Sequence, residues 1–175
     1  ALDTRYHQEL GNDLGNLLMR TVSMVGKYFD GEVPAPAGED PAARGIRGMC
    51  ESLEENIRKH VEAFEISLAI EEAWKVVRET NRFVEHSAPW KLAKSDEPAD
   101  RDKLATVLYT LSEACRVMLA NLYPILPDSA PKGLEQLGQE FAEESLHEVC
   151  GWGVMKPGTA VTKGKPLFPR IEDKG

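Results

Sequence analysis

Apolar residues recur every three or four positions over four long stretches of this 175-residue chain, and that period limits what the chain can fold into. The stretches run over 10–29, 41–61, 63–87 and 100–123. Residues at this spacing lie on one face of an α-helix, whereas a half-buried strand alternates apolar and polar residues. No useful length of the sequence alternates in that way. We therefore predict an all-α fold, an antiparallel bundle of about five helices.

Proline and capping residues mark the ends of the predicted helices. Asp40 followed by Pro41 is typical of an N-cap and the first turn of a helix. The segment 124–127 begins and ends with proline, which cannot continue a helix, so the fourth helix is expected to end there. A short fifth helix is expected within residues 128–138.

Glycine and proline recur throughout the chain after Gly151, and they rule out a regular helix there. We predict two parts from this change. Residues 1–150 form a helical domain, in which 141–149 adds a turn or two, and residues 151–175 form an irregular C-terminal tail.

The composition describes an ordinary globular chain with room for one substantial core, since 42% of its residues are hydrophobic and 29% are charged. No apolar run approaches the roughly 20 residues of a membrane span, and no signal-peptide core is present. We therefore expect a cytoplasmic protein without a membrane partner. The odd number of cysteines, three, follows no pairing pattern, and reduced and mostly buried thiols are expected.

A proline followed by a tryptophan interrupts the third helix. Because proline disfavours helical geometry at the residue before it, the helix is expected to end near Ser87 or Ala88. Trp90 then lies at a corner after Pro89, where its indole can pack inward on one side and leave the other face free. In the alternative interpretation, Trp90 and Leu92 only cap the core.

Two pairs of polar residues are spaced one helical turn apart. Asn16 and Arg20 lie on a polar stripe of the first helix, and Asn81 and Glu85 lie near the end of the third. We expect Asn81 and Glu85 to hold the proline–tryptophan corner by hydrogen bonds. For both pairs, a solvated helix face is the alternative.

Three separated motifs agree with one known family in content and in order. They comprise 16–20 followed by 27–31, then 81–92, then 122–127 with 134–138. Together they resemble the anticodon-binding domain of methionyl-tRNA synthetase, a class I aminoacyl-tRNA synthetase. The synthetases for cysteine, leucine, isoleucine and valine carry related bundles, but Asn16 and Arg20 together with Ala88-Pro89-Trp90 favour the methionine enzyme.

The resemblance implies roles for particular residues. Trp90 would stack on an anticodon base, which is worth about 1–3 kcal/mol, and Asn16 and Arg20 would hydrogen-bond to base edges. Asn81, Lys91 and Lys94 are possible supporting contacts.

The resemblance also implies what lies outside this chain. The His-Ile-Gly-His and Lys-Met-Ser-Lys-Ser signatures of the family's catalytic domain, and its cysteine knuckle, do not occur in the sequence. We therefore predict no catalytic residue here. The chain looks like the C-terminal part of a ligase that attaches methionine to tRNA(Met) with ATP and Mg. Its partners would be the CAU anticodon loop of tRNA(Met) and the catalytic domain or chain of the same synthetase, on which the tail 151–175 would pack.

Other chemistry is poorly supported by the sequence. The four histidines lack metal-ligand spacing, and the glycines form no phosphate-binding loop. His147 and Cys150 are three apart and could share a metal, but no second pair accompanies them. We predict no metal and no cofactor on this chain.

The formal net charge of −8 favours a second function class, because nucleic-acid binding normally uses a basic face. This alternative is a helical protein-interaction domain that has kept the fold and lost tRNA binding. A basic rim around an exposed Trp90 would favour RNA, and a buried indole under acidic cover would favour the interaction domain.

Overall fold

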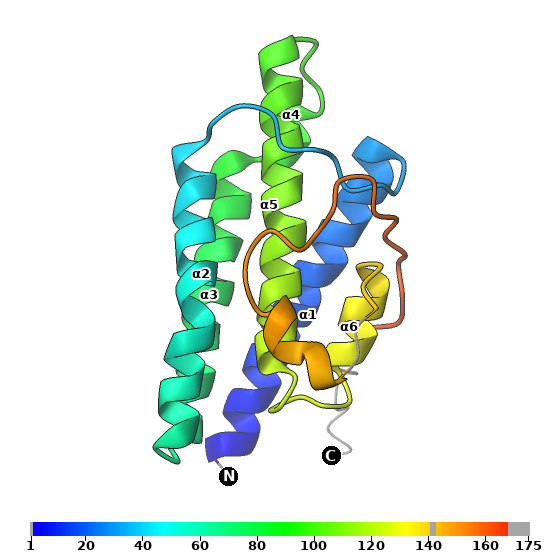
Figure 1. Cartoon of the computed structure of the whole chain (residues 1–175). Coiled ribbons are helices and arrows are strands. Elements are labelled where there is room, and N and C mark those ends of the chain that lie inside the picture. The colour runs from blue at the N-terminus through cyan, green and yellow to red at the C-terminus, as the bar shows by residue number, and fades with distance from the viewer. Residues whose placement is uncertain (1, 141–142, 168–175) are drawn as a thin grey trace, which may run out of the picture.

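The computed structural model describes residues 2–140 and 143–167, and in them the all-α prediction is confirmed. The helices are α1 (Leu2–Phe29), α2 (Pro41–Glu62), α3 (Ile66–Ser87), α4 (Pro89–Leu92), α5 (Pro98–Leu122), α6 (Ala130–Gln136) and the 3-10 helix η1 (Glu143–Val149). The long helices α1, α2, α3 and α5 form the bundle, and α6 and η1 cover one end of it (Figure 1). The helix count is close to the predicted five.

Helix α5 runs through the centre of the molecule. Every residue from Leu104 to Leu122 is buried, and the helix packs against α1, α2, α3, α4, α6 and η1. A helix that is enclosed on all sides must satisfy its polar groups internally, because water cannot reach them. The three- and four-residue spacing of apolar residues in the sequence identifies only one face of α5 and does not reveal that its polar residues are buried as well.

The predicted helix starts differ from the observed ones in three places. Helix α2 begins at Pro41 as predicted, and Asp40 accepts hydrogen bonds from the backbone N–H groups of Ala42 (3.0 Å) and Ala43 (3.4 Å). Helix α1 begins well before the predicted residue 10, where no apolar stripe signals a helix. Helix α3 begins at Ile66 and not at 63, because Phe64 has a positive φ of 60° that a continuous helix excludes. Helix α5 begins two residues early, at Pro98.

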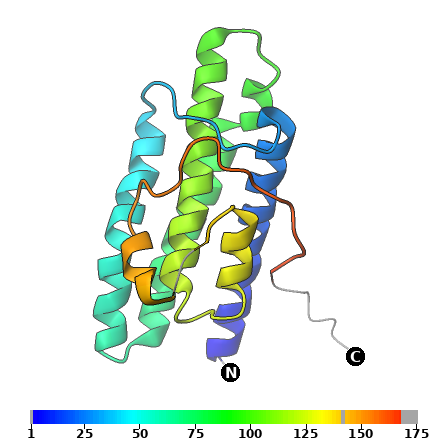
Figure 2. The ribbon, with the colours of Figure 1, turned by 45° about the vertical axis from the view of Figure 1, so that its right-hand side comes forward.

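The chain after Gly151 has no regular helix as far as residue 167, as predicted. The expected turn over 141–149 is the 3-10 helix η1, and residues 141 and 142 lie outside the described residues. The tail crosses α5 and then passes beside α1 (Figure 2). Backbone hydrogen bonds join Val33 to Gly158 and Thr159, and Gly31 to Val161, at 2.7–2.9 Å. The tail passes so close to Gly138 (φ 69°) that a Cβ there would lie 2.4 Å from the carbonyl oxygen of Ala160.

A buried ion pair on α5 holds the first part of the tail. Glu113 and Arg116 are 0% and 1% exposed and pair with each other. The second carboxylate oxygen of Glu113 accepts hydrogen bonds from the backbone N–H groups of Gly153 (2.6 Å) and Met155 (3.1 Å). The Arg116 guanidinium donates to the carbonyl oxygens of Val149 and Gly151. Both charges are therefore satisfied by backbone groups of an irregular segment.

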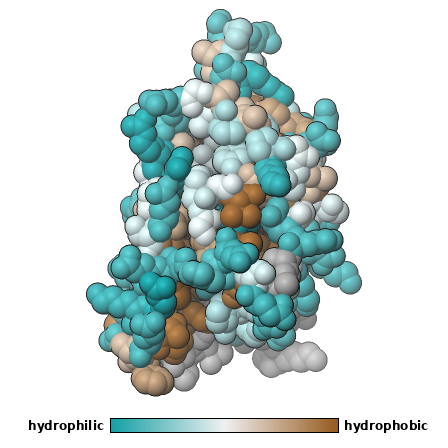
Figure 3. Space-filling model, viewed as in Figure 1, coloured by the Kyte–Doolittle hydropathy of each residue, from teal (hydrophilic) through white to brown (hydrophobic). Residues whose placement is uncertain are grey.

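The surface is mainly hydrophilic in the view of Figure 3, with apolar side chains gathered toward its lower left. The exposed large apolar residues lie around the turn between α2 and α3. They are Val61, Phe64, Ile66 and Leu68, and Phe64 is 93% exposed. Apolar patches of this kind often contact another part of a protein or a partner. None of the helices in the described part is long and apolar enough to cross a membrane.

We expect Arg116→Met to lower the free energy of unfolding by about 3–5 kcal/mol, because it leaves the buried Glu113 carboxylate without its countercharge. Arg47→Met is the matched control, since Arg47 pairs with Glu51 on the exposed face of α2 and should change stability by less than about 1 kcal/mol. Urea denaturation followed by circular dichroism measures both. Equal effects of the two substitutions would contradict the proposed anchoring of the tail.

Candidate nucleic-acid interface

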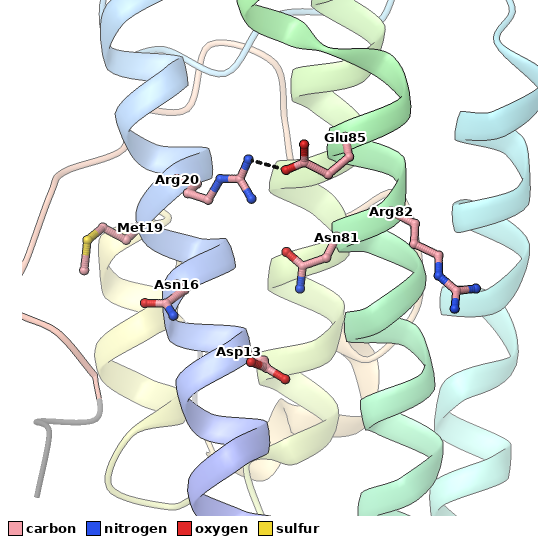
Figure 4. Close-up of a pocket in the computed structure, with 7 residues that line it drawn as sticks. All are labelled: Asp13, Asn16, Met19, Arg20, Asn81, Arg82 and Glu85. Carbon is pink, nitrogen blue, oxygen red and sulfur yellow. Dashed lines mark hydrogen bonds and ion pairs between the residues drawn. The ribbon is translucent and has the colours of Figure 1, made fainter.

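An open groove lies between α1 and α3. Polar side chains from both helices line it together with one methionine: Asp13, Asn16, Met19 and Arg20 from α1, and Asn81, Arg82 and Glu85 from α3 (Figure 4). The one-turn spacing of Asn16 and Arg20, and of Asn81 and Glu85, places each pair on a single helix face. The packing of α1 on α3 brings the two faces together. Three of the predicted site residues, Asn16, Arg20 and Asn81, therefore share one groove.

Arg20 and Glu85 connect the two walls of the groove. Nη2 of Arg20 lies 3.0 Å from Oε1 of Glu85, and both side chains are substantially exposed. The expectation that Glu85 would hold the proline–tryptophan corner is wrong, because its side chain faces α1 and pairs with Arg20 instead. The corner is held by backbone hydrogen bonds.

Asp13 lines the groove beyond Asn16 and has a fixed orientation. Its Oδ2 accepts a hydrogen bond of 3.0 Å from Nε1 of Trp74, and the Arg78 guanidinium lies over that indole, 5.3 Å from the ring centroid. Sequence reasoning did not single out Asp13. Its position three residues before Asn16 is the signal that could have identified it.

The expected break before Pro89 is confirmed, and a short helix that was not predicted follows it. Helix α3 ends at Ser87, and Ala88 adopts the left-handed conformation (φ 46°, ψ 64°). The carbonyl oxygen of Ala88 then accepts hydrogen bonds from the N–H groups of Lys91 (2.9 Å) and Leu92 (3.3 Å), which closes the single turn α4. A left-handed alanine costs about 1–2 kcal/mol, so the packing around this corner must stabilise it.

Trp90 lies in α4, beyond the Glu85 end of the groove, and does not line the groove itself. Its indole is half-buried and packs on the core, and the role of its exposed part stays a prediction. Lys91 and Lys94 are exposed close to it. Glu85, Asp96 and Glu97 are exposed nearby in the chain as well, so the segment around Trp90 carries charges of both signs.

The basic residues along α3 are paired with acidic neighbours. Lys75 pairs with Glu72 (3.3 Å), Arg78 with Glu71 (3.3 Å) and Arg82 with Glu79 (2.6 Å). The groove therefore offers hydrogen-bonding groups more than net positive charge. Amides and a guanidinium of this kind suit the edges of unpaired bases.

The thiols and histidines do not form a metal centre or an activated nucleophile in the described residues. No group of three or more metal-ligating side chains occurs there. His147 contacts Glu54, while Sγ of Cys150 donates to the carbonyl oxygen of Leu146. Burial raises the pKa of Cys50 and of Cys115 to about 12 and that of Cys150 to about 11.

Comparison with known proteins identifies the family of this chain. The family model described as the anticodon-binding domain of methionyl-tRNA ligase matches residues 35–175. The chain belongs to that family. The methionine–tRNA ligase of Streptomyces coelicolor is 39% identical over 97% of the chain and 33% of its own length. That of Deinococcus radiodurans is 39% identical over 99% of the chain and 25% of its own length.

A solved structure agrees with this family assignment. The free form of methionyl-tRNA synthetase from Mycobacterium tuberculosis superimposes with a TM-score of 0.87 at 35% identity, over 97% of this chain and 34% of that one. The chain thus spans only a quarter to a third of the length of the relatives named here.

We expect the three cysteines of the native protein to react slowly with a thiol reagent at pH 7 to 8. Only the thiolate is nucleophilic, and burial keeps these thiols protonated. All three should react quickly in denaturant, and counting modified thiols by mass spectrometry in both states measures this. Rapid labelling of Cys115 in the native protein would contradict the buried environment described above.

Proposed function

We propose that this chain is the anticodon-recognition part of a methionine–tRNA ligase and that its groove between α1 and α3 binds bases of the CAU anticodon of tRNA(Met). The observation that carries the proposal is the meeting of Asn16, Arg20 and Asn81 in one open groove that leads toward Trp90. Membership of the family supports it.

Each of these groups has a distinct part in the proposed recognition. The amides of Asn16 and Asn81 can donate to and accept from base edges, whereas the Arg20 guanidinium only donates. The partly exposed indole of Trp90 offers a face on which one unpaired base can stack. Lys91 and Lys94 would attract the phosphates of the RNA next to that base by their positive charge.

The ligase reaction belongs, in this proposal, to a catalytic part that this chain does not include, because the chain spans only part of its relatives. That part would attach methionine to tRNA(Met) with ATP and Mg, in the cytoplasm. We propose that the tail 151–175 contributes to the contact with it. Anticodon binding would then make the reaction selective for one tRNA.

A protein-interaction domain without tRNA binding is the second candidate. The net charge of −8 and the exposed apolar turn around Phe64 favour it. It differs from the first candidate in requiring no selectivity for an RNA sequence.

Trp90→Ala and Arg20→Ala should each remove selective binding to a fluorescent stem-loop carrying CAU, compared with a loop in which one anticodon base is changed. Loss of the stacked base should weaken binding by about 1–3 kcal/mol. Fluorescence anisotropy at two salt concentrations measures affinity. Circular dichroism should remain nearly unchanged, because Trp90 is only half-buried.

Equal binding of both loops by the unmodified chain, or no binding at low salt, would refute the proposal and leave the interaction domain. If Trp90→Ala did not fold, Trp90 would be chiefly a core residue that stabilises the fold.

Glu85→Gln should tighten binding of both loops by up to about fivefold, since RNA would no longer compete with the Glu85 carboxylate for Arg20. The gain should be at least as large for the CAU loop as for the changed loop, because Arg20 is proposed to contact base edges. Glu51→Gln removes the same charge from an exposed pair on α2 and is the control. Weaker binding of Glu85→Gln would instead mean that the carboxylate positions Arg20 for the RNA.

A further inference from the structure

The C-terminal tail lies on the opposite side of α1 from the Glu85 wall of the groove. Gly15, Met19 and Val22 of α1 line a small pocket together with tail residues 163–167. Met19 also lines the groove between α1 and α3. Figure 4 shows Met19 directed toward the tail and Arg20 directed toward α3, on either side of the same helix. Since a helix with its side chains is about 10–12 Å across, the tail runs within one helix width of the groove.

The tail is fixed in this position by bonds to α6. The backbone N–H of Thr162 donates to the carbonyl oxygen of Gln136 (2.9 Å), and Nε2 of Gln136 donates to that of Lys165 (3.2 Å). Leu167 is buried against Gly133, where an added Cβ would come within 3.0 Å of a methyl carbon of Leu167. The segment between these anchors therefore has a defined path along α1.

This path carries two positively charged side chains. Lys163 and Lys165 are both exposed, and neither makes a salt bridge within residues 2–140 and 143–167. On the other side of the groove, Arg78 and Arg82 are paired with glutamates. The two sides of the groove thus differ in available positive charge.

We propose that Lys163 and Lys165 bind phosphates of the RNA strand whose bases enter the groove, so that the tail forms a backbone-binding rail beside the base-reading helix. The proposal rests on the function proposed above. Phosphate contacts fix the position of a nucleic acid without reading its sequence, and base contacts select the sequence. A chain with a net charge of −8 can bind RNA in this way, because Lys163 and Lys165 lie beside α1, within a helix width of the groove.

The test replaces both lysines, as Lys163→Gln with Lys165→Gln, and measures binding of the CAU stem-loop and of the loop with one changed base across a range of salt concentrations. Each phosphate contact contributes about 0.7 to 0.9 to the slope of log affinity against log salt. The double variant should lose about 1.4 to 1.8 from that slope. Over a fourfold rise in salt, the unmodified chain should therefore lose about tenfold more affinity than the variant does. The ratio of affinities for the two loops should stay the same.

Arg58→Gln with Lys59→Gln is the matched control. It removes two positive charges from exposed positions on α2, a helix that packs on α3 and α5 on the far side of the bundle from α1 (Figure 1). The control should leave the salt slope almost unchanged. Lys163→Arg with Lys165→Arg should restore the slope, since phosphate binding requires positive charge at these positions and not a particular side chain.

The outcomes separate this inference from the proposed function. Selective binding by the unmodified chain with an unaltered slope in the double glutamine variant would overturn the phosphate-binding role alone. A changed ratio between the two loops would overturn it too, because the lysines would then read bases. Equal binding of both loops by the unmodified chain would refute the proposed function and, with it, the rail.

Discussion

The buried pair of Glu113 and Arg116 is the interaction on which the outer part of this structure depends. A charge pair enclosed at the centre of a bundle is unfavourable unless its remaining donors and acceptors are satisfied. Here backbone groups of residues 149–155 satisfy them. The need to complete this network brings an irregular segment back across α5, and the path of the segment from there leads to α1. The polar groups on the central helix therefore fix the first part of the tail, and hydrogen bonds to residues 31–33 and to α6 hold the part that follows.

The groove depends on the same helix in a different way. Helices α1 and α3 both pack on α5 and on each other through their apolar stripes. Their polar stripes therefore face each other at the surface and line the groove. Helix α3 then ends at a left-handed Ala88, which fixes the direction of α4 and the position of Trp90. Hydrogen-bonding groups and the aromatic ring are thus placed by regular helices and one backbone corner, with no mobile loop between them. Such rigid placement suits selection between similar bases.

How much the sequence predicts follows from the range of each interaction. A helix that is buried on one side repeats apolar residues every three or four positions, so α1, α2, α3 and the apolar stripe of α5 could be identified from the sequence. The N-cap at Asp40 could be identified too, because it involves only residues next to each other in the chain. The pairing of Arg20 with Glu85 joins residues far apart in the chain, and it emerges only when α1 and α3 pack. Apart from each other, the partners of Glu113 and Arg116 are backbone groups, which leave no mark in the sequence. The binding roles expected for Asn16, Arg20 and Trp90 could be predicted only through the resemblance to a known family.

Net charge is a poor guide to whether such a chain can bind RNA. In 0.1 M salt an exposed charge is screened over about 10 Å, so what matters is the charge within a helix width of the binding surface. Along α3 that charge is cancelled by glutamates, while Lys163 and Lys165 on the tail make no salt bridge with another described residue. Helix α1 then separates two tasks, since groups on one side can select bases and lysines on the other can add affinity. Because the tail is held by the buried network on α5, by residues 31–33 and by α6 before it passes α1, the bundle itself determines where the lysines could add that affinity.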